Sequence, residues 1–454
     1  MNKENQKINP ITEGVIWKQI LIFFFPIVVG TLFQQLYNTI DAVIVGRFVG
    51  KEALASVGGS AAVLTYQVVA FFTALSSGAT VIISQFFGAG DLKNLHKGMH
   101  TAYAFSVIIS ILISILGWYT TPWLLTITKT PEDIIGDSTL YLRIYFLGII
   151  ATLIYNMGSS IMRAIGDSKR PLYYLIVCCF LNIGLDILFV IIFHMGIAGA
   201  AIATVISQAI SAILVTRTLM SSYGTIKLKL RAIRLDMPIL KSELRIGLPS
   251  SLQACMYGLT NIIIQTAINS FGTDTSAAWA AFGKMDLIFW AVSGAFGVAV
   301  TTFSGQNYGA GKMDRVYKSV RTCLGMSLGI CGSILVLLMI FARPLFYLFT
   351  TDQNVISIGV FMLLYIVPSY AIYIFVEILS GALRGMSDVV IPTLITLGGI
   401  CGVRLPWILI MVPVHRELST ILISYPLAWG GTVLFLVPYY FYKKRKIQTK
   451  PIYS

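Results

Sequence analysis

The chain has 454 residues, of which 56% are hydrophobic and only 11% are charged, and its formal net charge is +14. Soluble domains contain about 25% charged residues, so this chain has too little polar surface for a water-soluble fold of its size. It also lacks the alternating segments of roughly ten residues that mark an outer-membrane barrel. The composition therefore predicts an all-α integral membrane protein.

Twelve apolar segments follow one another along the chain, each near the ~20 residues that a helix needs to cross the hydrocarbon core. The first follows a polar start and has no small-residue cleavage pattern, so we expect it to be a retained span and not a signal peptide. The twelve expected transmembrane helices are centred on 18–45, 54–86, 98–121, 138–160, 171–194, 196–219, 247–270, 280–304, 317–341, 355–381, 390–412 and 418–441.

The basic residues test this count of spans. With a cytoplasmic N-terminus, twenty-five Lys and Arg residues fall on the cytoplasmic side and five fall in outer loops. This positive-inside asymmetry predicts a multi-pass protein of the cell (inner) membrane with both termini cytoplasmic. It also explains the net charge without a nucleic-acid partner. We expect the basic linker and tail to lie on anionic headgroups of the lipid bilayer.

Sequence landmarks recur at a nearly constant spacing. The GAG triplets at 88–90 and 309–311 lie 221 positions apart, as do RAIGDSKRP at 163–171 and RGMSDVVIP at 384–392. Six spans separate equivalent points, so the halves share one orientation, which is the parallel-repeat plan of transporters. The predicted parts are an N-terminal six-helix lobe (1–219), a cytoplasmic basic linker (220–246), a C-terminal six-helix lobe (247–442) and a cytoplasmic basic tail (443–454).

Small residues inside the spans are interpreted as packing positions. Gly46 with Gly50, and Gly325 with Gly329, are expected to let helices approach closely. Pro26 near the start of the first span is expected to allow a kink.

Several segments carry a family resemblance: QNYGAGK at 306–312, RAIGDSKRP, MGIAGAAIATVISQ at 195–208, and the pattern NxxxD at 182–186. Together they resemble the MATE (multidrug and toxic compound extrusion) transporters over nearly the whole chain, most closely the DinF-like branch. The resemblance implies two six-helix lobes in a V with a central cleft. It also implies ion-driven export of amphipathic, often cationic aromatic compounds.

Acidic residues at the centre of a span are functional candidates, because each costs ~2.5–3.5 kcal/mol on insertion scales. Gln34, Asn38 and Asp41 are spaced i, i+4, i+7 on one face of the first span. Asn182 and Asp186 are spaced i, i+4 on the fifth span. Both aspartates come late in spans that run outward, so we expect them at similar depth.

Two carboxylates in a poorly hydrated pocket cannot both ionise cheaply, so such a pair would take up a proton. In DinF-like transporters, acids at matching positions are implicated in proton coupling. The resemblance therefore assigns the coupling cation to Asp41 and Asp186, with Asn182 and Asn38 orienting them. The alternative is that Asp41 only caps a helix end. The repeat offset places Ile264 and Trp407 at the equivalent positions, so this site is not duplicated.

The second half offers a secondary ion or charge site made of Glu377, Asp286 and Arg404. Asp286 follows Lys284, so a local charge interaction is as reasonable there as transport chemistry. Glu377 and Arg404 lie in successive spans, and a buried pair between them is the expectation. The NorM-like branch resembles this chain less, because its sodium site uses an acid in the seventh span and this chain has none there.

The function expected is multidrug antiport by alternating access, driven by protons in preference to sodium, with no cofactor beyond the coupling ion. Amphipathic drug-like compounds would meet aromatic and methionine side chains in the cleft, and we expect a monomer. Candidate cleft residues are Gln34, Tyr37, Met157 and Met256.

Two other function classes are weaker. A lipid-linked precursor flippase of the same superfamily would have a basic cavity, but basic residues within the spans are almost limited to Arg143 and Arg404. A membrane-embedded enzyme would need a polar catalytic cluster, and none can be assembled from this sequence.

Two local patterns are rejected as ligand sites. GQNYGAGKM at 305–313 lacks the first glycine of a phosphate loop and has Met313 where Ser or Thr would bind magnesium. His96 and His100 have the spacing of a metal pair but no third ligand, so we expect them on a solvated helix face and predict no metal site.

Overall fold

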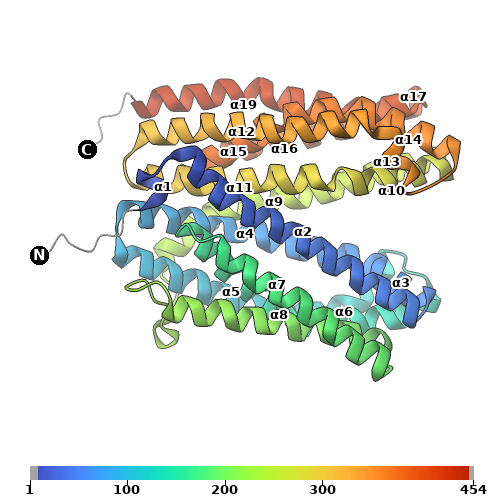
Figure 1. The fold of residues 1–454 in the computed structure, drawn as a ribbon, viewed down its shortest axis with the longest axis horizontal. Coiled ribbons are helices and arrows are strands. Elements are labelled where there is room, and N and C mark those ends of the chain that lie inside the picture. The colour runs from blue at the N-terminus through green and yellow to red at the C-terminus, as the bar shows by residue number, and fades with distance from the viewer. Residues whose placement is uncertain (1–8, 449–454) are drawn as a thin grey trace, which may run out of the picture. The chain divides into compact units, whose positions relative to one another are not determined.

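The computed structural model describes residues 9–448, which form helices joined by short connections and one isolated β-bridge between Tyr223 and Ile226 (Figure 1). These residues divide into two compact units. The N-unit consists of residues 25–251, and the C-unit consists of residues 9–24 together with 252–448.

The N-unit is built around one central helix, α6, which packs against α4, α5 and α8. Its helices are the later part of α2 (Ile16–Phe48), α3 (Lys51–Gly58), α4 (Ser60–Ala89), α5 (Leu92–Ile127), α6 (Glu132–Ala164), α7 (Lys169–Asp186), the π-helix η1 (Ile187–Ile192), α8 (Gly196–Ser221), the short η2 (Leu230–Ala232) and the first part of α9 (Met237–Asn269).

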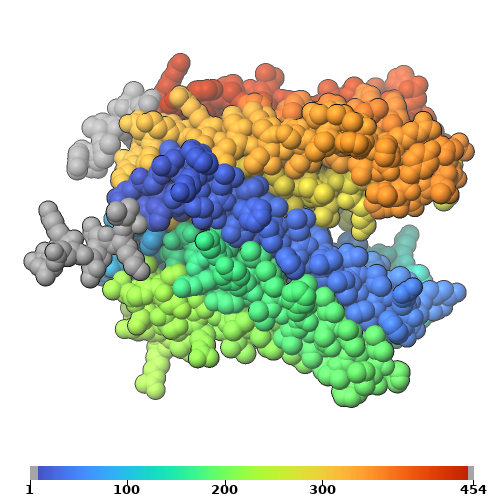
Figure 2. Space-filling view, in the orientation of Figure 1, coloured from blue at the N-terminus to red at the C-terminus, as the bar shows by residue number. Residues whose placement is uncertain are grey.

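The C-unit packs around α11 and α15, and α12 and α14 cover the face turned to the viewer in Figure 2. Beyond its shares of α2 and α9, it contains α1 (Pro10–Glu13), α10 (Thr273–Met285), α11 (Leu287–Gly309), α12 (Met313–Ile340), α13 (Ala342–Tyr347), α14 (Gln353–Ile366), η3 (Val367–Ser369), α15 (Tyr370–Gly385), α16 (Val390–Leu397), the π-helix η4 (Gly398–Arg404), α17 (Leu405–Val414), α18 (Leu418–Leu422) and α19 (Ser424–Gln448).

The helices confirm an all-α membrane fold. Within residues 9–448, eleven helices are long and apolar enough to cross a membrane, several of them made of two elements in line. The remaining expected span, 247–270, lies in α9, which has 33 residues and is therefore about 50 Å long. Polar Gln253, Asn261 and Gln265 make α9 less apolar than the other eleven.

The boundaries of the two units differ from those of the expected lobes, 1–219 and 247–442, in two segments of the chain. Residues 9–24 belong to the C-unit and residues 237–251 to the N-unit, because α2 and α9 each run through both units. Pro26 and Pro249 lie close to these two changes, and a proline removes a helix N–H at the place where it stands. Of the expected basic tail, 443–448 continue α19, and 449–454 lie outside the described residues, as do Lys3 and Lys7.

Backbone geometry repeats at the predicted offset. Gly90 and Gly311, the last residues of the two GAG triplets, have φ of 70° and 69°. The residue after each donates its N–H back across the turn, at 3.0 Å to Phe86 O and at 2.9 Å to Asn307 O. This left-handed ending of a helix favours glycine. The triplets are therefore conformational signals that end equivalent helices.

The second repeated motif forms the same kind of turn. Gly166 and Ser387, again 221 positions apart, have φ of 92° and 60°. The aspartate that follows each turn accepts a 2.7 Å hydrogen bond from a tyrosine hydroxyl, Asp167 from Tyr223 and Asp388 from Tyr439. The RAIGDSKRP and RGMSDVVIP segments thus fold alike although few of their residues match.

Helix α7 shows how a lipid-facing helix carries a polar site. Tyr173, Val177 and Phe180 are exposed by 56%, 46% and 65%, at the i, i+4, i+7 spacing of one face. Asn182 and Asp186 are fully buried on the same helix. In Figure 2 this helix lies on the surface turned to the viewer. Its apolar stripe suits contact with lipid, and its polar residues face the interior of the N-unit.

Candidate cation-coupling site

Asp41 and Asp186 both lie in the interior of the N-unit. Asp41 lies on the later part of α2 and is 9% exposed, and Asp186 is the last residue of α7 and is fully buried. The two carboxylates are close enough to interact electrostatically. The structure thus brings together the two acids that the spacing of polar residues had selected.

Helix geometry changes at Asp186. The α-helix ends there and the π-helix η1, Ile187–Ile192, follows directly. A π-helical turn is wider and less stable than an α-helical one, and such turns are frequent at functional sites. The sequence of η1 does not predict this change, because Ile, Leu, Phe and Val are compatible with either kind of helix.

Most polar atoms of this site have no partner. Within the described residues, both carboxylate oxygens of Asp186, Oδ1 of Asp41 and Oδ1 of Asn182 are buried without a hydrogen-bond donor. The amide Nδ2 of Asn182 lies 3.5 Å from Thr204 Oγ1, at the outer limit for a hydrogen bond. Buried polar groups are otherwise almost always paired. The free oxygens therefore suit a proton or a small cation.

Sequence reasoning missed Tyr141, Thr204 and Gln208, and it named Tyr37 only as a candidate cleft residue. The Tyr141 phenol, on α6, lies near both carboxylates. The Tyr37 phenol lies near Asp41 and beside Gln208 of α8, whose Oε1 is also buried without a donor. Thr204 and Gln208 stand i, i+4 inside MGIAGAAIATVISQ, and that polar pair in an apolar helix was the available signal.

The other predicted residues of this site are more dispersed. Asn38 and Gln34 are exposed, whereas Asp41 on the same helix α2 is buried. Tyr37 is 9% exposed, and Met157 is 6% exposed within a hydrophobic cluster of the N-unit. Met256, in the C-unit part of α9, is half-buried. Asn182 is thus the predicted orienting residue that the structure places beside an acid.

In the C-unit, Asp286 is a satisfied acid. It separates α10 from α11, and its Oδ2 accepts hydrogen bonds from Tyr370 Oη at 2.6 Å and from Trp290 Nε1 at 2.9 Å. It forms no ion pair with Lys284 within the described residues. The expected local charge interaction is therefore replaced by two neutral donors.

Glu377 and Arg404 do not form the expected pair within the described part of the chain. Glu377 Oε2 accepts a 2.9 Å hydrogen bond from Tyr373 Oη. Arg404 is 2% exposed, and its guanidinium lies over the rings of Tyr425 and Trp429, 4.1 Å and 5.3 Å from their centroids. Cation–π contacts stabilise a buried cation there in place of a carboxylate.

Comparisons with known proteins agree with the repeat. The sequence model of the MatE family matches residues 26–188 and again 249–410. The chain is 27% identical over 442 residues to the probable multidrug resistance protein YoeA of Bacillus subtilis (strain 168), covering 95% of each chain. It is 31% identical over 358 residues to the probable multidrug resistance protein YpnP of the same strain, covering 78% of this chain and 79% of the relative.

Solved structures share the fold. A MOP superfamily transporter from Pyrococcus furiosus Vc1 (DSM3638), described as having a binding pocket of reverse polarity, matches with a TM-score of 0.90 at 20% identity. That match covers 99% of this chain and all of the other. An outward-facing multidrug resistance MATE family transporter matches with a TM-score of 0.89 at 20% identity, with the same coverage. The chain therefore belongs to the MATE family, whose members are membrane transporters and not enzymes.

Proposed function

We propose that this chain is a secondary active multidrug exporter that exchanges a cation, protons in preference to sodium, for amphipathic, often cationic aromatic compounds. The observation that carries the proposal is that two electrostatically interacting buried acids, Asp41 and Asp186, have three oxygens without a described donor: Oδ1 of Asp41 and both oxygens of Asp186. The relatives named as probable multidrug resistance proteins support the substrate class. No cofactor is invoked beyond the coupling ion.

The acids would couple transport through their protonation. Two adjacent carboxylates in an apolar interior repel each other when both are charged, and a proton removes that repulsion. Tyr141 stands near both acids and Asn182 beside Asp186, so either side chain can orient the protonated form. Protonation from one side of the membrane and release on the other would then favour different conformations in turn.

The C-unit acids are less suited to this role. Asp286 has two donors and Glu377 has one, so their charge is already stabilised by fixed partners. The flippase alternative gains nothing from the basic residues. Arg143 lies 5.2 Å from the centroid of Trp118, and Arg404 lies over Tyr425 and Trp429. Both guanidinium groups thus already contact aromatic rings.

The test uses the full chain in inside-out vesicles from a cell deficient in efflux pumps. Uptake of ethidium, an aromatic cation, is followed by fluorescence under an imposed proton gradient without sodium, and under a sodium gradient at equal pH. We expect uptake driven by the proton gradient and abolished by a protonophore. Uptake that is unchanged after both gradients are collapsed would refute ion-coupled export. Uptake driven by sodium alone would refute the preference for protons.

For the cellular setting, we propose a cell-membrane protein with both termini cytoplasmic, acting as a monomer. The basic residues of the described loops support this orientation. Accessibility of single cysteines introduced at Ser222 and at Lys129 to an impermeant thiol reagent would test it, with labelling from outside expected only at position 129.

A further inference from the structure

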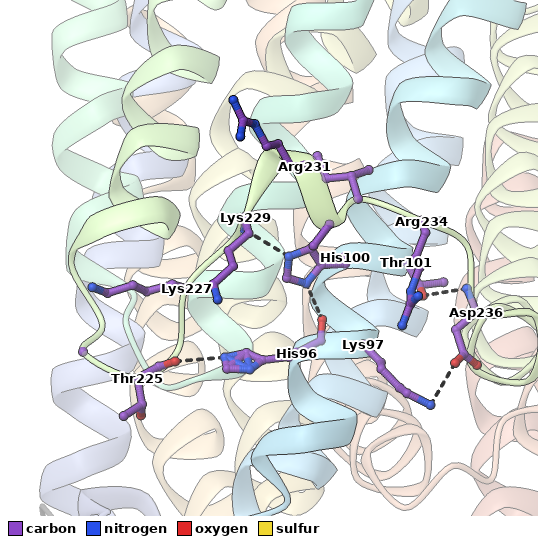
Figure 3. A pocket seen from close by; sticks show the side chains of 13 residues that line it. His96, Lys97, His100, Thr101, Thr225, Lys227, Lys229, Arg231, Arg234 and Asp236 are labelled. Atoms are coloured by element: carbon purple, nitrogen blue, oxygen red, sulfur yellow. Dashed lines mark hydrogen bonds and ion pairs between the residues drawn. The ribbon is translucent and has the colours of Figure 1, made fainter.

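The connection between α8 and α9 forms a pocket with the first turns of α5 in the N-unit. The pocket has a volume of about 720 Å³ and is drawn in Figure 3. Its lining is mostly polar and basic: His96, Lys97, His100, Thr101, Gly224, Thr225, Lys227, Lys229, Arg231, Ala232, Ile233, Arg234 and Asp236. It lies apart from the acid pair, on the side where the basic loops gather.

The connection packs against the N-unit and is hydrogen-bonded to it. Ile226 and Leu228 are 8% and 1% exposed and belong to a hydrophobic cluster with α5 and α6. His96 Nε2 lies 2.9 Å from Thr225 O, and the Lys229 N–H donates to His100 Nε2 at 3.0 Å. The pocket walls are therefore built on fixed backbone.

His96 and His100 hold this connection in place through hydrogen bonds to its backbone. His100 is 7% exposed, so the expectation of a solvated helix face was wrong for it. Its Nδ1 lies 2.6 Å from His96 O, which makes Nδ1 the donor and leaves Nε2 as the acceptor. With both ring nitrogens engaged, His100 is bound as the neutral tautomer.

The single acid of the pocket is already paired. Asp236 Oδ2 lies 3.2 Å from Lys97 Nζ, and the Asp236 N–H donates to Thr101 Oγ1 at 3.1 Å. This arrangement fixes the end of the connection just before α9. It also removes the one negative charge that could neutralise the remaining cations.

Four cations of the pocket remain without a counter-ion. Lys227, Lys229, Arg231 and Arg234 are exposed, and none of them forms an ion pair with another described residue. In Figure 3 the Lys229 side chain extends towards His96, with Lys227 to one side, whereas Arg231 points away from them. The pocket thus concentrates positive charge on a rigid frame, which is the arrangement that binds a phosphate group.

Two exposed apolar residues flank these cations along the chain. Leu230 is 51% exposed and Met237 is 64% exposed, at the two ends of the segment that carries Arg231 and Arg234. A soluble phosphate would leave both in water. A phospholipid would place its headgroup on the cations and its glycerol and acyl region against the apolar side chains.

We propose that this pocket binds the phosphate headgroup of an anionic phospholipid of the adjoining leaflet. The site is independent of the acid pair and of the proposed transport function. Cations near an anionic membrane surface attract its lipids, and a fixed cluster between two membrane helices selects a headgroup more strongly than scattered charges do.

The test compares binding to the purified full chain in non-ionic detergent of three probes: dioctanoyl phosphatidylglycerol, dioctanoyl phosphatidylcholine and inorganic phosphate. The variant carries Lys227→Gln, Lys229→Gln and Arg234→Gln, which keep the Lys229 N–H that bonds His100. The matched control carries Lys18→Gln, Lys318→Gln and Arg321→Gln, three exposed cations without a described ion pair. Both variants lose the same charge.

We expect phosphatidylglycerol to bind the native chain and the control within about twofold of each other, and the pocket variant roughly tenfold or more weakly. The zwitterionic lipid should bind weakly to all three. An equal loss in both variants, or no saturable binding, would overturn the proposal. Equally strong binding of inorganic phosphate would overturn it in favour of a soluble anion. If the triple variant misfolds, Lys229→Gln alone must still weaken binding.

Discussion

The carboxylates of Asp41 and Asp186 lie within electrostatic reach of each other inside the N-unit, and neither acid has a full set of donors. Asp286, the comparable acid of the C-unit, accepts bonds from both Tyr370 and Trp290. A satisfied acid contributes to structure, whereas an unsatisfied pair gains most from binding a proton. This contrast separates the roles that the buried acids are expected to play.

We expect Asp41→Asn and Asp186→Asn each to reduce proton-driven ethidium export at least tenfold while the protein still folds. Asparagine has the size of aspartate but cannot change its charge at these pH values, so the coupling step is lost. Export rate under an imposed proton gradient is the measurement. Asp286→Asn serves as the control and should retain proton-driven export. If both site variants export at the native rate, the assignment of the coupling acids is wrong.

Tyr370→Phe should destabilise the C-unit without altering the ion that drives transport. The change removes the 2.6 Å hydrogen bond to Asp286 Oδ2 and leaves only the bond from Trp290. Loss of one partner of a buried polar group costs about 1–3 kcal/mol. Thermal unfolding in detergent checks this, with Tyr66→Phe as control because Tyr66 is 72% exposed. Equal unfolding temperatures for the two variants would count against the bond.

The fold was largely predictable because its signals are local and repeated. Apolar length identified the spans, and the 221-residue offset corresponds to matching left-handed turns at Gly90 and Gly311. The seventh expected span, 247–270, falls within the helix α9, which is not among the eleven described helices that are apolar enough to cross a membrane. The passage of α2 and α9 through both units depends on tertiary contacts, which no local pattern of residues reports.

The candidate site was predictable only in part. Helical spacing and the cost of a charge in lipid selected Asp41, Asn182 and Asp186. The same reasoning could not find Tyr141, because tyrosines are common in membrane helices. Tyr141 lies 100 residues after Asp41 and 45 before Asp186, so only the folded chain places it near both acids. It also paired Glu377 with Arg404, since opposite charges attract, and overlooked that aromatic rings can surround a buried guanidinium.

Close helix packing involves glycines that the sequence did not single out. A Cβ on Gly78 would lie 2.0 Å from Glu243 O, whereas one on Gly325 or Gly329 would meet nothing within 4 Å. We expect Gly78→Ala to push α4 from α9 at a cost of at least 1–3 kcal/mol. Thermal unfolding is the measurement, and Gly136→Ala in α6, with open space around it, is the control. If Gly78→Ala unfolds no earlier than the control, this contact is not close-packed in solution.

Arg315 should hold the N-terminal helix α1 on the C-unit. One of its guanidinium nitrogens, Nη2, donates to Ile11 O at 3.0 Å and to Gly14 O at 2.5 Å. Arg315→Gln would remove these bonds and leave only the contacts that Lys312 makes with Thr12 and Glu13. Faster hydrogen exchange of residues 10–15 is the expected result. Arg321→Gln, further along α12, is the control, and equal exchange in both variants would contradict the role of Arg315.

Asp91 caps the start of α5, and we expect the protection of the Asn94 amide against hydrogen exchange to depend on pH. Hydrogen bonds from the backbone N–H and side chain of Asn94 lower the pKa of the Asp91 carboxyl. A carboxyl whose pKa is lower in the folded chain stabilises it above the unfolded pKa of about 3.9 and loses this effect as pH falls through the folded value. Asp91→Ala should therefore weaken protection of the Asn94 amide at neutral pH.

The same comparison at a pH below the folded pKa of Asp91 should show a smaller difference between Asp91→Ala and the native chain. Hydrogen exchange at the Asn94 amide, corrected for the intrinsic effect of pH, is the measurement. Asp91→Asn is the matched control, because its amide oxygen still accepts the Asn94 N–H but does not titrate. A loss of protection in Asp91→Ala that stays constant across this range would mean that the carboxylate charge contributes nothing to the cap.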